Sequence, residues 1–104
     1  NINEERNRIL KNIGDRDYVS TLEIDGHEID SVEFANKIDK LFITNSIITF
    51  VIGGSYGLHN DVKNSSDYNL SFSKFTFPHQ LFRVILLEQI YRCFKILNNE
   101  TYHK

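Results

Sequence analysis

The chain has 104 residues, of which 40% are hydrophobic and 25% charged, with five glycines and one proline. This is the composition of one globular domain spanning residues 1–104, and it excludes a disordered or fibrous chain. The net charge is −2, with six Lys and Arg against ten Asp and Glu in residues 1–50 and six against four in residues 51–104. The small excess of basic residues in the second half does not by itself indicate a nucleic-acid binder. If the chain recognises RNA, recognition has to be local or shared with a second subunit or the ribosome.

The sequence also argues against a membrane protein and against a disulfide framework. Its longest apolar stretch, Ile47 to Leu58, is too short for a bilayer span, and no charged-then-apolar leader opens the chain. The single cysteine, Cys93, lies in an apolar helical run, which favours a buried thiol. We therefore expect a cytoplasmic protein that does not enter the membrane.

The N-terminal half predicts a helix, a strand and a second helix. Residues 4–13 place apolar side chains on one helical face and then meet Gly14, a helix stop. Residues 18–24 (YVSTLEI) are rich in strand-forming residues and end at Asp25-Gly26, which predicts a tight turn. Residues 31–41 have apolar side chains at helical spacing, with Asp30 or Ser31 as the N-cap. The apolar face of this second helix comprises Val32, Phe34, Ala35, Ile38, Leu41 and Phe42.

The C-terminal half predicts two further strands and a long helix. Residues 47–52 (IITFVI) form a continuous apolar run, typical of a parallel strand covered on both faces. Residues 58–66 have a short helical pattern, and residues 68–73 (YNLSFS) alternate like a strand. Residues 78–98 begin with a proline suited to the first helical turn and are apolar around most of the helix. The order from residue 18 is βαβαβα, and so apolar a last helix predicts burial on more than one side, with a second subunit of a homodimer as one neighbour.

A glycine-rich turn, Gly53-Gly54-Ser55-Tyr56-Gly57, follows the apolar strand directly. Parallel sheets bind ligands at the carboxyl ends of their strands, where glycines let a ligand approach the backbone. The spacing matches neither a dinucleotide fingerprint nor a P-loop, and a tight turn that binds no ligand explains it equally well. The histidines and carboxylates show no metal-ligand spacing, so no metal is expected.

Residues 71–80 (SFSKFTFPHQ) interleave phenylalanines with hydroxyl groups and end in Pro-His before the long helix. The phenylalanines alone are compatible with ordinary core residues, and His79 with an idle first-turn polar residue. The last residues, Tyr102-His103-Lys104, have the composition of a frayed end.

Three segments together resemble one known family. They are TLEIDG (21–26), VIGGSYGL (51–58) and the run from residue 70 to residue 104, and the resemblance covers the whole chain. The sequence is identified as similar to the RlmH group of SPOUT-class enzymes, which methylate N3 of a pseudouridine in large-subunit ribosomal RNA. Members are about half again as long, so the resemblance implies that a first strand and helix precede Asn1 and are missing here.

The resemblance implies an α/β fold with a mostly parallel sheet, helices on both faces and a trefoil knot through which the C-terminal helix is threaded. It implies a homodimer acting on ribosomal RNA within the ribosome, with S-adenosyl-L-methionine as cofactor. Matched positions place the cofactor at Leu22 after the first strand, at Gly53 and along the loop 72–77. The residues of that loop are Phe72, Ser73, Lys74, Phe75, Thr76 and Phe77.

The catalytic candidates implied by the resemblance are His79, Tyr102, His103 and Lys104. In the family, the Pro-His loop and the C-terminal tail converge near the target base from different subunits. Lys104 stands where many relatives have Arg, which weakens any role that needs a planar bidentate donor. Arg83 is compatible with a phosphate contact or with a solvated helix face.

Two further functions remain open. One is a knotted fragment that binds cofactor and dimerises without catalysis, because the absence of the first strand exposes a sheet edge. The other is an unrelated α/β enzyme that binds phosphate, which the glycine turn alone suggests and the loop 72–79 argues against.

Overall fold

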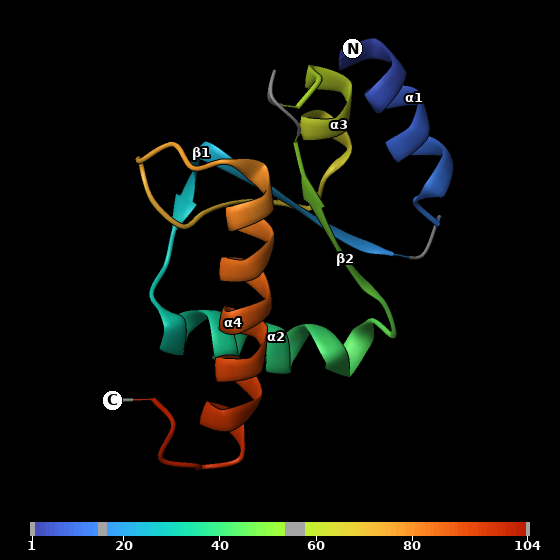
Figure 1. Cartoon of the computed structure of the whole chain (residues 1–104). Helices are drawn as coiled ribbons and strands as arrows, with labels where there is room; N and C mark the ends of the chain where they lie inside the picture. The colour runs from blue at the N-terminus through green and yellow to red at the C-terminus, as the bar shows by residue number, and fades with distance from the viewer. Residues whose placement is uncertain (1, 15–16, 54–57, 104) are drawn as a thin grey trace.

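The structure, a computed structural model, describes residues 2–14, 17–53 and 58–103. Helices and strands alternate along this part of the chain (Figure 1). The elements are α1 (Ile2–Asn12), β1 (Tyr18–Glu28), α2 (Ser31–Thr44), β2 (Ile48–Ile52), α3 (Asn60–Ser65), β3 (Tyr68–Ser71) and α4 (His79–Leu97). The predicted order of elements is confirmed, with β3 ending two residues earlier than the alternation suggested.

The three strands form one parallel sheet in the order β2-β1-β3. β1 is central: its Thr21 pairs with Val51 of β2 and with Asn69 of β3. Parallel strands need crossover connections. Helix α2 connects β1 to β2, and helix α3 connects β2 to β3. α2 and α4 cover one face of the sheet and α1 and α3 the other (Figure 1), which confirms helices on both faces.

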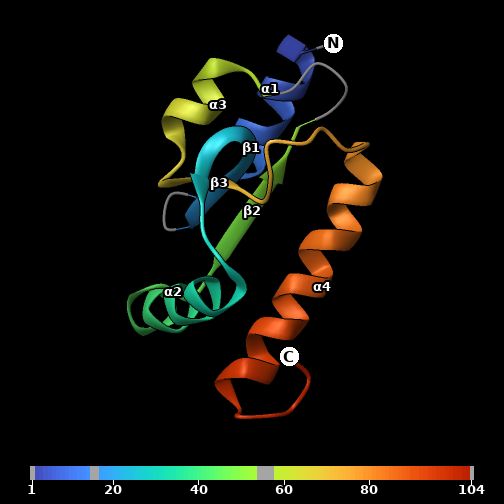
Figure 2. The same ribbon diagram turned by 90° about the vertical axis from the view of Figure 1, so that its left-hand side faces the viewer.

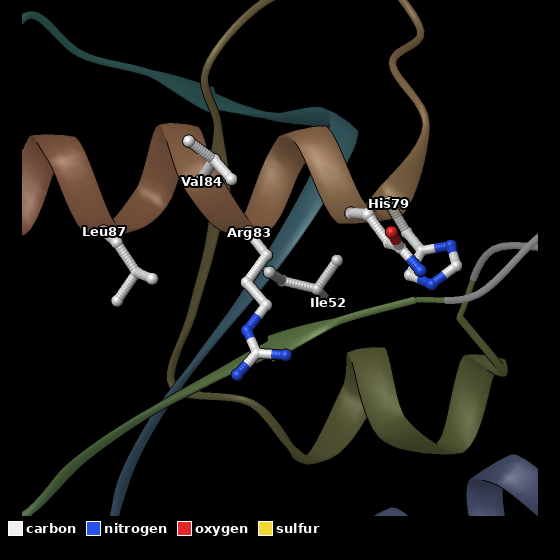
Figure 3. A pocket seen from close by; sticks show the side chains of 6 residues that line it. Ile52, His79, Arg83, Val84 and Leu87 are labelled. Atoms are coloured by element: carbon white, nitrogen blue, oxygen red, sulfur yellow. The ribbon is translucent and has the colours of Figure 1, made fainter.

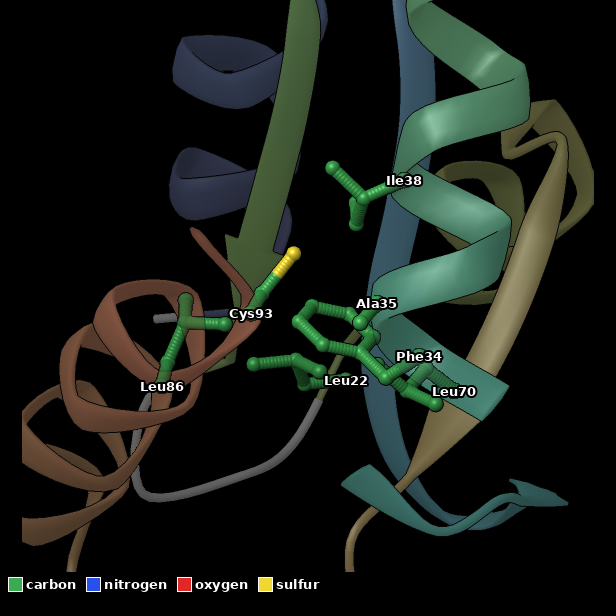
Figure 4. Close-up of a cluster of buried hydrophobic side chains, with 7 residues drawn as sticks. All are labelled: Leu22, Phe34, Ala35, Ile38, Leu70, Leu86 and Cys93. Carbon is green, nitrogen blue, oxygen red and sulfur yellow. The ribbon is translucent and has the colours of Figure 1, made fainter. Parts of the chain in front are cut away.

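The larger core lies between the sheet and the pair α2 and α4 (Figure 4). Its buried members are Leu22, Phe34, Ala35, Ile38, Leu70, Leu86 and Cys93. Burial raises the pKa of the Cys93 thiol, and the charge of Asp39 adds to the shift, so the thiol stays protonated. The prediction of a buried, unpaired cysteine is confirmed.

A smaller core lies on the opposite face, under α1 and α3. Val19 and Val51 from the sheet pack there with Leu58 and Val62. The apolar face of α1 covers them only in part, and no residue of α1 is buried. Helix α1 is therefore held by packing at its end rather than by enclosure.

The tight turn predicted at Asp25-Gly26 is wrong, because β1 continues through these residues to Glu28. Leu22 and His27 both pair with Leu70 of β3, so the chain between them bulges out of register. Gly26 permits this: a Cβ there would lie 2.7 Å from the carbonyl oxygen of Asn69. The glycine that suggested a turn is instead required for the close contact between the backbones of β1 and β3. We call residues 22–27 the β1 bulge.

Burial also departs from the sequence pattern at three places. Val32 and Phe42, assigned to the core face of α2, are 43% and 47% exposed. β2 was expected to be covered on both faces, yet only Val51 is buried, because β2 is an edge strand. α4 was expected to be buried on more than one side, yet in the single chain only Leu86 and Cys93 are buried.

Replacing Gly26 by alanine is expected to destabilise the fold by about 1–3 kcal/mol, because the new methyl group would overlap the backbone of Asn69 and Leu70. Urea unfolding measures the change. Gly14→Ala is the matched control: its Cβ would meet only the side-chain carboxylate of Asp17, at 3.0 Å, and no backbone atom. Equal losses for the two variants would mean that the close approach at Gly26 is unimportant.

The N-cap of α2 gives a pH-dependent prediction. The Asp30 carboxylate accepts a hydrogen bond from the Glu33 N–H at 2.8 Å, which lowers the pKa of Asp30 below its ordinary value of 3.8. Since the pKa is lower in the folded chain, the stabilisation is complete above pH 3.8 and is lost as pH falls through the folded value. Asp30→Ala should lower the melting temperature near pH 6, and this difference should shrink below pH 3.8. Asp30→Asn, which keeps the cap, should melt close to the unsubstituted chain near pH 6, and a loss as large as that of Asp30→Ala would contradict the cap.

Candidate functional site

Three segments meet at the carboxyl edge of the sheet (Figure 2): the β1 bulge, the end of β2 at Ile52 and Gly53, and the loop 72–78 after β3. They meet because all three strands are parallel and therefore end on the same side. This edge is where open α/β sheets bind their ligands. It contains the residues assigned to the cofactor from the sequence.

The loop after β3 is tied to the β1 bulge through one backbone carbonyl. The Ile24 oxygen accepts hydrogen bonds from Ser71 Oγ at 3.0 Å and from Lys74 Nζ at 3.2 Å. Ser73 Oγ accepts a bond from the Phe75 N–H at 3.0 Å, which shapes the turn. We call these two bonds to the Ile24 carbonyl the clasp. The bond from Ser71 is buried, whereas the bond from Lys74 is exposed to solvent.

Phe82, in the first turn of α4, anchors both ends of the same loop. Phe72 stacks on its ring with centroids 6.1 Å apart, and Phe77 meets it edge-on at 5.4 Å. Phe75 instead is 76% exposed. Within this loop the Ser73 carbonyl accepts a bond from Ser71 Oγ at 3.1 Å, and the Phe75 N–H is already bonded to Ser73 Oγ. No loop bond between two backbone groups involves residues 73–77 in the described ranges, so the other peptide groups of this segment are open to a ligand.

Leu22 lies within β1 and not after it, which corrects the sequence assignment. Its side chain is 7% exposed and packs in the larger core (Figure 4). Gly53 directly follows β2 at the same edge. The rest of the glycine turn, residues 54–57, lies outside the described residues.

His79 is the first residue of α4 and lines a cleft of about 690 Å³ between that helix and the end of β2 (Figure 3). Ile52, Val84 and Leu87 form its apolar lining, and Gln80 and Arg83 its polar groups. In Figure 3 the Arg83 side chain reaches across the cleft toward β2. The cleft adjoins the carboxyl edge of the sheet through Ile52 and is open to solvent.

The C-terminal tail folds back along α4. The Tyr102 ring packs edge-on against Tyr91 with centroids 5.1 Å apart, and its hydroxyl lies 3.5 Å from a Glu88 oxygen. His103 Nδ1 lies 3.0 Å from Arg92 Nη1. The tail is therefore docked rather than frayed as far as His103, and Lys104 lies outside the described residues.

The chain does not bring its catalytic candidates together. Arg92, where the tail docks, follows His79 by thirteen residues of continuous helix, a separation of about 20 Å along the axis. His79 directly follows the loop 72–78, whereas Tyr102 and His103 lie on the C-terminal half of α4. The described candidates thus form two groups at different positions along the same helix.

Sequence reasoning missed two residues that organise the tail, Glu88 and Arg92. Arg92 Nε bonds both Glu88 oxygens, at 3.1 and 3.2 Å. Their i, i+4 spacing on one helix was a readable signal. The Ile24 carbonyl was also missed, and no side-chain pattern could have shown it.

The described residues contain no group of three or more His, Cys, Asp or Glu side chains placed to hold a metal ion. Within the same ranges no helix has the length and apolar character needed to cross a membrane.

Comparison with known proteins agrees with this geometry. The family described as "Predicted SPOUT methyltransferase" matches residues 1–103. The chain is 58% identical over 102 residues to "Ribosomal RNA large subunit methyltransferase H" of Finegoldia magna and 55% identical over 102 residues to the protein of that name from Clostridium tetani. Each alignment covers 97% of this chain and 64% of the relative. The chain therefore belongs to the SPOUT methyltransferase family, and the resemblance to the RlmH group inferred from its motifs is confirmed.

Proposed function

We propose that the chain transfers a methyl group from S-adenosyl-L-methionine to N3 of a pseudouridine in large-subunit ribosomal RNA. The observation that carries the proposal is the convergence of three strand ends at one edge, where Ser71 and Lys74 fasten the loop after β3 to the Ile24 carbonyl. The names of the relatives supply the RNA substrate. Because the chain spans 64% of their length, their activity is carried over as a proposal.

The carboxyl edge suits S-adenosylmethionine in both chemistry and shape. Backbone groups of residues 73–77 other than the Ser73 carbonyl and the Phe75 N–H can read the adenine and ribose, and Phe72 and Phe77 give the loop apolar walls held by Phe82. Gly53 lets a ligand approach the end of β2 closely. Leu22 contributes from the floor beneath, since its side chain is buried. The remaining loop residues, Ser73, Lys74, Phe75 and Thr76, complete the cofactor-binding segment.

Methyl transfer to N3 forms an N–C bond, breaks the carbon–sulfur bond of the donor and requires a place for the N3 proton. When bound, S-adenosylmethionine supplies an electrophilic methyl group on a sulfonium sulfur. The chain has to position the base, accept the proton and stabilise the charge that its loss leaves on the ring. His79, Tyr102, His103 and Lys104 are the candidates for these roles, with His79 closest to the cofactor loop.

A homodimer would unite the two groups of candidates as half-sites of one catalytic site. Large apolar side chains line one stripe of α4 and are 45–61% exposed, which is typical of a covered interface. They are Leu81, Val84, Leu87, Tyr91 and Phe94. Two such stripes packed antiparallel around a two-fold axis would bring the tail of one protomer toward His79 of the other. We also propose that α4 is threaded through a trefoil knot, as the family resemblance implies.

The second candidate function is a knotted fragment that binds cofactor and dimerises without catalysis. β2 lies at the edge of the described sheet, so the backbone groups on its outer side pair with no other strand of that sheet. Such an edge is expected where a further strand is missing, and this favours the second candidate. Methyl transfer separates the two candidates, since both predict cofactor binding.

Calorimetric titration of S-adenosylmethionine into the chain is expected to show saturable binding. Lys74→Met should weaken the affinity about two- to tenfold, because it removes the bond from Lys74 Nζ to the Ile24 carbonyl that clasps the loop. Lys40→Met, which removes an equal charge from an exposed position of α2, is the control and should leave the affinity unchanged. No binding by the folded chain would refute both candidate functions.

Subunit mixing tests the composite site. His79→Ala and Tyr102→Phe should each reduce transfer of labelled methyl groups to unmethylated large ribosomal subunits. Mixed and re-equilibrated, the two variants should regain activity, because one of the two sites in a heterodimer then has both native residues. If His79 and Tyr102 of one chain served the same site, every site would keep one defect and mixing would restore nothing.

A further inference from the structure

Arg92 is the residue on which the C-terminal tail converges. Its guanidinium bonds Glu88 one turn earlier, lies 4.8 Å from the centre of the Tyr102 ring, and reaches His103 Nδ1 at 3.0 Å. Glu88 also lies 3.5 Å from the Tyr102 hydroxyl. One ion pair on α4 thus contacts both described catalytic candidates of the tail.

The contact between Arg92 and His103 fixes the chemistry of the imidazole. A guanidinium has five N–H donors and no acceptor, and it keeps its charge at any pH that proteins meet. His103 Nδ1 therefore has to be the acceptor, so the ring is neutral and its proton is on Nε2. In this state His103 can donate a hydrogen bond from Nε2 but cannot accept a proton there.

The same cluster extends toward the cofactor loop. Gln89 Nε2 lies 3.3 Å from Glu88 Oε1, and Ser31 Oγ bonds Gln89 Oε1 at 2.7 Å. Ser31 and Gln89 line a cavity of about 290 Å³ that also includes Phe72 of the cofactor loop. Hydrogen bonds therefore run without a break from that cavity to the tail.

We propose that Arg92, braced by Glu88, is a positioning residue that holds His103 as its neutral Nε2–H tautomer, so that His103 serves as a hydrogen-bond donor and not as the general base. This inference rests on the proposed function for its substrate. N3 of a uracil ring lies between two carbonyl groups, and their oxygens share the negative charge when the N3 proton leaves. A fixed N–H aimed at such an oxygen stabilises that charge.

Long-range ¹H–¹⁵N correlation spectra of the uniformly labelled chain distinguish the two histidine tautomers directly. His103→Gln identifies the signal. In the native chain His103 should show the Nε2–H pattern, and Arg92→Met should convert it to a mixture. Lys95→Met is the matched control: Lys95 bonds Glu100 at 3.0 Å and so holds the same terminal segment without touching His103. An Nδ1–H tautomer in the native chain, or equal changes in both variants, overturns the proposal.

The spectra need neither cofactor nor RNA, so their failure leaves the proposed function intact, and failure to bind S-adenosylmethionine leaves the tautomer assignment intact. In methyl-transfer assays Arg92→Met should lower kcat about tenfold or more with little change in KM for the cofactor, because a misplaced tail costs rate rather than binding. His103→Gln, which keeps an N–H donor at the position of Nε2, should retain more activity than His103→Ala. Equal loss in these two variants, with Nε2–H confirmed, overturns the donor role.

Discussion

The close approach of β1 and β3 at Gly26 is the constraint on which the site depends. Without a side chain there, the β1 bulge can lie against the backbone of Asn69 and Leu70. The bulge turns the Ile24 carbonyl toward the loop after β3, where Ser71 and Lys74 bond it. A regular strand pair would leave the loop without this clasp, and its phenylalanines would be tied only to Phe82. The loop 72–77 therefore takes its shape from the packing contact at Gly26.

The helix α4 imposes the second constraint, which is distance. A nineteen-residue helix is rigid on the scale of a substrate, so groups at its first turn and on its C-terminal half cannot approach each other within one chain. The exposed apolar stripe and the divided site are then two aspects of one arrangement. In the proposed dimer, a partner that covers the stripe would also supply the missing half-site, so packing and catalysis would depend on the same helix. This is why we regard the dimer as part of the catalytic proposal.

The sequence predicted local structure well where periodicity or capping determines it. Residues of α2 and α4, the Asp30 cap and the parallel order of strands follow from apolar spacing and from βαβ connections. It failed at Gly26, because a glycine needed for a close contact and a glycine needed for a turn give the same local signal. The resemblance also placed Leu22 after the first strand, although Leu22 pairs with Ile52 and Leu70 inside β1. Both errors come from pairing between distant segments, which periodicity does not encode.

Placement of the site residues divides in the same way. The loop 72–77, His79 and the tail were all assigned to the site by resemblance, and these assignments stay predictions. The contacts of the tail could not be predicted, because Tyr102 and His103 reach Glu88 and Arg92 through a reversal of the chain after α4. Their composition suggested only a frayed end, although the pair on α4 has the spacing of an ordinary surface ion pair.

The contacts that hold the tail are individually weak. An i, i+4 ion pair is worth about 0.3–0.5 kcal/mol and a cation–π contact at an exposed site about 0.5–1 kcal/mol. Spread over separate residues, such contacts would leave the tail free to sample many orientations. Here they share one guanidinium, whose Nε–H is bonded to both oxygens of Glu88 while Nη1 reaches His103, so each contact restricts the geometry of the others. The tail can thus be well oriented while remaining weakly bound, which fits the role proposed for it, since that role requires it to meet an RNA base and release it after transfer.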